Sequence, residues 1–180
     1  MGRRIQGFAF ESEISESLKH YQSKYDFIFE HMVDTNLFDF GIICDRCGHR
    51  VHHNLIIPKA VADFWIASNG KITFLEAKSS RSSSFPISNI REHQLSYALK
   101  MAYYNIDYWF MICDRRKPRH HKAYALKGIV LDEIMSSIAR KRKSIPWSLL
   151  EEHKDVIAIN KLKGGIWELD AFISSMIKHK

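Results

Sequence analysis

Two spacings of apolar residues along the chain predict both helices and strands. Between residues 8 and 24, Phe10, Ile14, Leu18 and Tyr21 recur at helical spacing with polar residues between them. Runs of β type follow at 26–31, 61–68, 71–78, 107–114 and 122–127, and further helices are expected over 89–104 (capped by Asn89), 131–141 and 167–177. This order predicts one mixed α/β domain over residues 1–180, with a central sheet flanked by helices. Residues 34–57 fit neither spacing, and we expect an insertion or a ribbon there.

The dipeptide Asn69-Gly70 separates two of the β-type runs. It is a strong hairpin signal, because a type I′ turn needs positive φ at both central positions. A two-residue turn fixes the register and sets Asp63 opposite Glu76. Side chains alternate along a strand, so Lys78 lies on the same face, two residues beyond Glu76.

Two carboxylates that face each other across a strand pair destabilise a sheet unless a cation lies between them. Carboxylate oxygens suit Mg²⁺ or Mn²⁺, and Mg²⁺ commonly takes one or two carboxylates plus a substrate phosphate. Lys78 could then orient or deprotonate an attacking water, or stabilise the charge of the transition state. The alternative is an ordinary Lys–carboxylate ion pair on a solvated face of the sheet. Apolar neighbours in both strands favour the metal site.

The charge balance favours a polyanionic partner. The 180 residues include 27 Lys and Arg against 20 Asp and Glu, a formal net charge of +7, and the pI is about 9.3. Basic residues cluster at 115–122 and 140–143, with Arg3 and Arg4 in addition. Each cluster alone could be a solvated loop, whereas the three together indicate nucleic acid.

No apolar run approaches the roughly 20 residues that cross a bilayer, and the first residues lack the apolar stretch of a signal peptide. Three cysteines are an odd number, which argues against a secreted disulfide framework. Cys113 lies in an apolar run and is expected to be buried. We therefore expect a soluble cytoplasmic protein, associated with the nucleoid or, if viral, present in the host cytoplasm.

The residues from Pro58 to Lys78 that include Asp63 and Glu76 resemble the PD-(D/E)xK nuclease motif. The following stretch is more specific. Glu76-Ala-Lys78, then Ser84-Phe85-Pro86, then His93-Gln94 is similar to the pattern of the RecU-type Holliday junction resolvases. Gly7-Phe-Ala-Phe-Glu11 and segments near 143–145, 151–152 and 169–170 extend the similarity over most of the chain.

The resemblance implies a restriction-endonuclease-like fold and a homodimer that makes paired nicks in four-way DNA junctions with Mg²⁺ or Mn²⁺. Asp63 and Glu76 would bind the metal, and Lys78 would be the catalytic lysine. Glu11 would be a helix-borne acid beside the site, and Gln94 the helix residue that faces it. Simpler interpretations remain: Glu11 could complement the helix dipole, and Gln94 could cap a loop. A junction has approximate two-fold symmetry, which is an independent reason to expect a symmetric dimer.

The DNA contacts are expected in the Ser-rich loop and the basic clusters. The residues are Arg3, Arg4, Ser79, Arg81, Arg91, Arg115, Arg116, Arg140, Lys141, Arg142 and Lys143. Residues 79–84 could equally be a plain flexible linker.

Members of the resembled family often carry a stalk before the catalytic aspartate, and residues 34–57 take that place here. Within them, Cys44 and Cys47 with His49, His52 or His53 have the spacing of a zinc knuckle. If zinc binds, it would hold together a stalk too short to build its own core. Because there is one cysteine pair, a metal-free segment is the other interpretation.

Three other functions are consistent with the sequence. The hairpin chemistry also fits another restriction or repair endonuclease, since the site specifies phosphodiester hydrolysis and not the shape of the DNA. A non-catalytic junction-binding recombination factor is a second alternative, although the intact Asp63, Glu76 and Lys78 argue against a decayed site. A zinc-knuckle nucleic-acid adaptor is the third.

Overall fold

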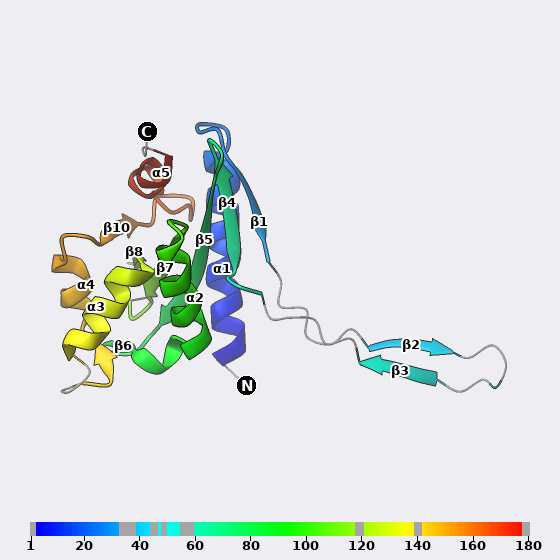
Figure 1. Ribbon diagram of the computed structural model, residues 1–180. Coiled ribbons are helices and arrows are strands. Elements are labelled where there is room, and N and C mark those ends of the chain that lie inside the picture. The colour runs from blue at the N-terminus through cyan, green and yellow to red at the C-terminus, as the bar shows by residue number, and fades with distance from the viewer. Residues whose placement is uncertain are drawn as a thin grey trace.

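The computed structural model describes residues 3–32, 39–43, 47, 50–54, 60–117, 121–138 and 142–177. A six-stranded sheet in the order β1-β4-β5-β7-β8-β10 forms its centre (Figure 1). The strands are β1 (Ile28–His31), β4 (Phe64–Ser68), β5 (Lys71–Ser80), β7 (Asp107–Asp114), β8 (Lys122–Lys127) and β10 (Ile157–Asn160). Neighbouring strands are antiparallel except β5 and β7, which run parallel and are connected through helix α2 (Glu92–Tyr103).

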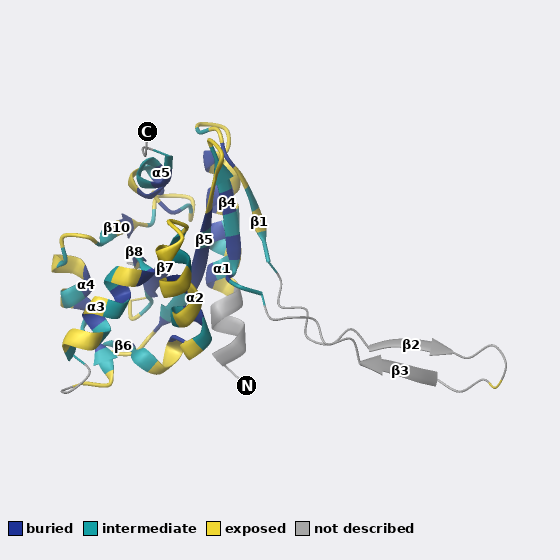
Figure 2. Cartoon of the chain, in the orientation of Figure 1, coloured by how far each residue is buried: buried dark blue, intermediate teal, exposed yellow. Residues whose placement is uncertain are grey.

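Helices cover both faces of this sheet. On one face, α1 (Arg3–Tyr21) and α5 (Asp170–Ile177) pack in a core that contains Phe10, Leu75 and Phe172. On the other face, α2, α3 (Gly128–Ile138) and α4 (Trp147–Glu152) pack around Phe110 and Leu131. Figure 2 shows the buried residues along the strands and on the helix sides that face them. The predicted mixed α/β class, a central sheet flanked by helices, is confirmed.

One glycine sets the spacing between α2 and α3. A Cβ placed on Gly128 would lie 2.4 Å from the Cβ of Ala98. Real side chains do not approach so closely, so a larger residue at position 128 would push the two helices apart.

Two small sheets complete the fold. β6 (Phe85–Pro86) pairs with β9 (Ser144–Ile145), and the 3₁₀ helix η1 (Ile87–Asn89) follows β6. β2 (Asp39–Ile43) and β3 (Arg50–Asn54) pair with each other as an antiparallel ribbon. A ribbon was one of the two structures expected within 34–57, and its role as a stalk stays a prediction.

Several predicted boundaries are wrong. β4 begins at Phe64 and not at residue 61, because residues 61–63 bend and the Tyr108 hydroxyl donates to the carbonyl of Val61 at 3.0 Å. The residue at the start of α2 is Arg91, since Asn89 ends the 3₁₀ turn η1.

Three helices also differ from the expected ranges. α1 begins before residue 8 and ends at Tyr21, α3 begins at Gly128 and not at residue 131, and α5 starts only at Asp170. The predicted end of the helix at residue 141 lies outside the described residues. Helix α4 and strand β10 were not predicted. In the described part of the chain, no helix is long and apolar enough to span a membrane.

Candidate active site

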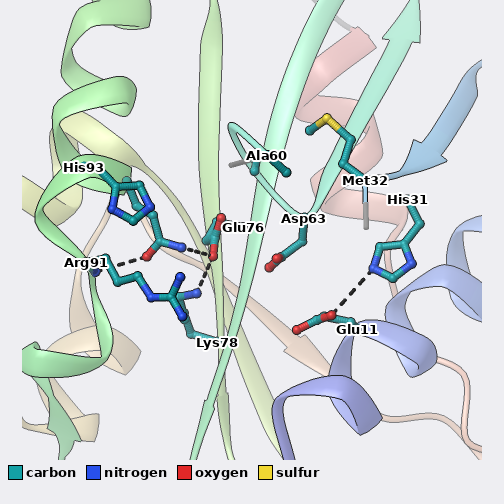
Figure 3. A pocket seen from close by; sticks show the side chains of 11 residues that line it. Glu11, His31, Met32, Ala60, Asp63, Glu76, Lys78, Arg91 and His93 are labelled. Atoms are coloured by element: carbon teal, nitrogen blue, oxygen red, sulfur yellow. Dashed lines mark hydrogen bonds and ion pairs between the residues drawn. The ribbon is translucent and has the colours of Figure 1, made fainter. Parts of the chain in front are cut away.

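The five residues expected in the catalytic site line one cavity of about 240 Å³. They are Glu11, Asp63, Glu76, Lys78 and Gln94, contributed by α1, the β4–β5 hairpin and α2. Figure 3 shows the three carboxylates directed toward one another from different elements.

The β4–β5 hairpin positions Asp63 and Glu76 as its turn predicts. Asn69 and Gly70 have φ of 50° and 74°, so both central residues are left-handed, and Ser68 pairs with Lys71. Asp63 immediately precedes β4, and its Oδ2 accepts a hydrogen bond of 2.7 Å from the backbone N–H of Ala77. This bond holds the Asp63 carboxylate beside β5, next to Glu76.

Glu76 is the most enclosed of the three acids, with 2% of its surface exposed. Its Oε1 accepts hydrogen bonds from the Nζ of Lys78 and the Nε2 of Gln94. The Tyr108 hydroxyl lies 3.2 Å from its Oε2. Burial, followed by the nearby Asp63 carboxylate, raises the pKa of Glu76 from 4.5 to about 7.

The other two carboxyl groups are perturbed in the same direction. Burial and then the charge of Asp63 raise the pKa of Glu11, and burial raises the pKa of Asp63 although Lys78 and the Ala77 N–H oppose it. Burial is thus the first cause of the raised pKa of all three acids, and for Glu11 and Glu76 the neighbouring Asp63 carboxylate adds to it.

This donor set fits a hard divalent cation. Three carboxylates with raised pKa would each be stabilised by added positive charge, and carboxylate oxygens are the ligands that Mg²⁺ and Mn²⁺ prefer. Among the described residues, no group of three or more His, Cys, Asp or Glu side chains is arranged so that it could hold a metal ion by itself. A Mg²⁺ site does not require one, because the ion keeps waters and takes substrate phosphate as a ligand.

Gln94 combines the two roles considered for it. Its Oε1 accepts from the backbone N–H of Arg91 at 3.0 Å and closes a capping box at the start of α2, while its Nε2 donates to Glu76. The helix start and the Glu76 carboxylate are therefore joined through one side chain.

Sequence reasoning missed two polar residues of the site. The Nε2 of His31 lies 3.5 Å from Glu11 Oε2, and its ring stacks on Phe64 with the centroids 4.7 Å apart. Tyr108 contacts Glu76 from β7. Neither had a sequence signal, because each reaches the cavity through strand pairings that join distant parts of the chain.

Comparisons with known proteins identify the family of the chain. A family model described as Recombination protein U, RecU, matches residues 5–164. The chain belongs to the RecU family. RecU proteins are Holliday junction resolvases, so recombination and DNA binding follow as the general function. No curated protein matches the chain.

Among solved structures, the chain resembles Hjc of Archaeoglobus fulgidus, a Holliday junction resolvase from an archaeal hyperthermophile. The identity is 8%, the match covers 83% of this chain and 88% of that one, and the TM-score is 0.37.

The expected DNA-binding residues of this RecU chain lie in different surroundings. Arg81, Arg91, Arg142 and Lys143 are exposed, and Ser79 is half-buried. Arg3 and Arg4 belong to α1, but their side chains are outside the described part, as are residues 140 and 141, Arg and Lys.

Arg115 is a poor DNA contact. Its side chain is 9% exposed, its Nη2 lies 2.9 Å from Glu13 Oε1, and its guanidinium covers the ring of Phe10. The expectation that it binds phosphate does not fit this position, since a buried and paired guanidinium cannot reach a solvent-side backbone. Arg116 remains 43% exposed and pairs with Asp114.

The zinc hypothesis is not tested by the described residues. Cys44 and His49 lie outside them, and of His52 and His53 only the strand β3 is described. Cys47 is exposed. Cys113 is buried in the core beneath α1, as expected.

Proposed function

We propose that this RecU-family protein is a Mg²⁺- or Mn²⁺-dependent endodeoxyribonuclease that resolves four-way junctions by paired phosphodiester hydrolysis. The observation that carries the proposal is the cavity that Glu11, Asp63 and Glu76, all with raised pKa, line together with Lys78. In an uncharacterised site, carboxylates perturbed by burial and by one another point to chemistry and not to folding. With DNA as the substrate, the activity would be exerted in the cytoplasm.

Asp63 and Glu76 would hold the cation, with Glu11 as a further acid on the opposite side of the cavity. A bound divalent ion would neutralise charge on the phosphoryl oxygens as the transition state forms. Lys78 donates to Glu76 and lies within the same cavity, where its ammonium can hold a water or a phosphate oxygen for in-line attack. Gln94 and Tyr108 would fix the orientation of the Glu76 carboxylate.

A homodimer follows from the symmetry of the substrate. Two nicks at symmetry-related strands require two identical sites, which an isologous pair of chains supplies. The end of α2 supports this proposal, because Tyr103, Tyr104 and Ile106 are large apolar side chains that are at least 36% exposed there, and the rings of Tyr103 and Tyr104 are in contact. Such clusters are typical of protein interfaces.

The test is cleavage of a labelled synthetic four-way junction with Mg²⁺, beside linear duplexes of the same sequences. We expect paired symmetric nicks in the junction alone. Asp63→Asn should abolish cleavage and leave junction binding largely intact, because it removes one ligand charge while keeping the shape of the side chain. Equal cutting of linear duplex would indicate a general endonuclease. Tight junction binding without cutting in Mg²⁺ or Mn²⁺ would indicate a structural recombination factor.

A further inference from the structure

A second cavity, of about 360 Å³, lies where β7, β8 and β10 come together. β10 is the edge strand of the sheet opposite β1, and β8 and β7 follow it toward the centre (Figure 1). Its lining holds four permanent cations against two acids: Arg116, Lys117, Lys122 and Lys161 against Asp114 and Glu151. We call this cavity, defined by those six residues, the distal cationic pocket.

The two acids hold cations in place and do not cancel the charge of the pocket. Asp114 receives the Arg116 guanidinium from two nitrogens, Nε at 3.0 Å and Nη2 at 2.7 Å, while the guanidinium covers the ring of Trp147. Glu151 pairs with Lys122, and each of these two side chains is 49% exposed. An exposed pair of this kind can be opened at little cost when a stronger anion arrives.

The surroundings of His121 combine burial with nearby positive charge. It lines the same pocket, and its pKa is lowered by burial and then by the charges of Arg115 and Lys161. Asp114 and Glu13 oppose this shift without reversing it.

The distal cationic pocket is connected to the active site through the Ser-rich loop. β5 carries Glu76 and Lys78 and ends at Ser80, which pairs with Asp114 in the parallel strand β7. Beyond Ser80, the carbonyl of Ser82 accepts from the indole Nε1 of Trp147 at 3.0 Å. The Arg116 guanidinium rests on that same indole.

The separation of the two sites matches a few nucleotides of DNA. Glu76 pairs with Phe110, four residues before Asp114. At about 3.3 Å per residue along a strand and about 4.8 Å between strands, the pocket lies roughly 15 Å from Glu76. Phosphates follow one another by about 3.4 Å of helix axis on each strand, so roughly four nucleotides span this distance.

We propose that the distal cationic pocket binds a backbone phosphate of a junction arm, about four nucleotides from the scissile phosphate. Lys117 and Lys122 are the cations that make this contact, because Arg116 is held by Asp114 and Lys161 by Glu13. The inference rests on the proposed function, since it assumes that the scissile phosphate lies at Glu76 and Lys78. It assigns to the pocket the task of aligning the arm along the Ser-rich loop.

The first test measures junction affinity in EDTA over a range of salt concentrations for Lys117→Gln, Lys122→Gln and Glu151→Gln. Each lysine variant should lower the steepness of the log–log salt dependence by about 0.9, the value for one lost phosphate contact. Glu151→Gln should tighten binding, because it releases Lys122 from its pair. Lys71→Gln, at the far end of β5, is the matched control and should leave the slope unchanged.

The second test neutralises the phosphates three to five nucleotides from the cut as methylphosphonates. The wild-type protein should bind this modified junction more weakly than the unmodified one. Lys122→Gln has already lost the contact, so it should bind both junctions with the same affinity. The inference would be overturned if the affinity losses caused by the methylphosphonates and by Lys122→Gln were additive. It would also be overturned if the lysine variants had the same salt slope as the Lys71→Gln control. The pocket would then be only a solvated set of ion pairs. A wild-type protein that fails to prefer or cut junctions would instead refute the proposed function.

Discussion

The charge on Glu76 should make the metal-free protein less stable at neutral pH than a variant that lacks the charge. Glu76→Gln keeps the shape of the side chain and its hydrogen bonds. The amide oxygen can accept from Lys78 and Gln94, and the amide nitrogen can donate to the Tyr108 hydroxyl, which in turn donates to Val61. The substitution therefore isolates the cost of the buried charge.

The magnitude follows from the pKa of Glu76, which burial and Asp63 raise from 4.5 to about 7. Between these two values the folded state binds more protons than the unfolded state, so stability falls as the pH rises through that window. A tenfold change in proton affinity corresponds to about 1.4 kcal/mol. Ionisation of Glu76 therefore lowers the free energy of unfolding by about 3 kcal/mol at pH 8 and by almost nothing at pH 4. For a chain of this length that is roughly 6–12 °C in Tm.

The assay is thermal or urea unfolding at pH 4 and pH 8, in EDTA and then in excess Mg²⁺. In EDTA at pH 8, the free energy of unfolding of Glu76→Gln should exceed that of the wild type by up to about 3 kcal/mol. The difference between the two proteins should disappear toward pH 4. Mg²⁺ should stabilise the wild type at pH 8 and have little effect on the variant. Glu152→Gln, an exposed acid on α4, is the control and should show no pH-dependent gap. A Glu76→Gln protein that is less stable than the wild type at both pH values would refute the reasoning.

Three further predictions concern single side chains. Tyr108→Phe removes a hydrogen bond to Glu76 and should lower the free energy of unfolding by about 1 kcal/mol. It should also raise the Mg²⁺ concentration at half-maximal cleavage, while the rate at saturating Mg²⁺ stays near normal. An unchanged Mg²⁺ requirement would contradict a positioning role for Tyr108. Arg115→Met should lower the free energy of unfolding by about 2 kcal/mol. This is less than the loss of a fully buried ion pair would cost, because Glu13 is partly exposed. The salt dependence of DNA binding should stay as in the wild type. Tyr103→Lys changes a side chain that is 83% exposed and should weaken dimer formation in analytical ultracentrifugation; an undiminished dimer would exclude this end of α2 from the interface.

Local signals in the sequence were sufficient for the hairpin that carries Glu76 and Lys78. Asn69-Gly70 determines the turn, the turn determines the register, and the register sets Asp63 beside Glu76 with Lys78 two residues further along. Every step concerns neighbours on one hairpin. For that reason it could be predicted without knowing the rest of the fold.

The remaining parts of the site depend on long-range pairing that no local pattern encodes. Tyr108 approaches Glu76 because β7 runs parallel to β5, after a connection through α2. His31 reaches Glu11 because β1 pairs with β4 and brings its end against α1. The basic run at 115–122 is a similar case. The sequence shows a row of cations there, but it does not show that the Arg115 side chain turns into the core.

Charge and structure are coupled at Glu76 because its partners each make a second bond. Tyr108 contacts both Glu76 and the carbonyl of Val61, which precedes Asp63, and Gln94 contacts both Glu76 and the amide that starts α2. The bend before β4 and the first turn of α2 are thus arranged around one carboxylate. A cation bound there would stabilise the helix start and the bend together, since both are held by side chains that contact Glu76. Substrate phosphate, which would complete the coordination of the cation, would therefore favour the ordered site, so that affinity for the metal and affinity for the scissile strand rise together.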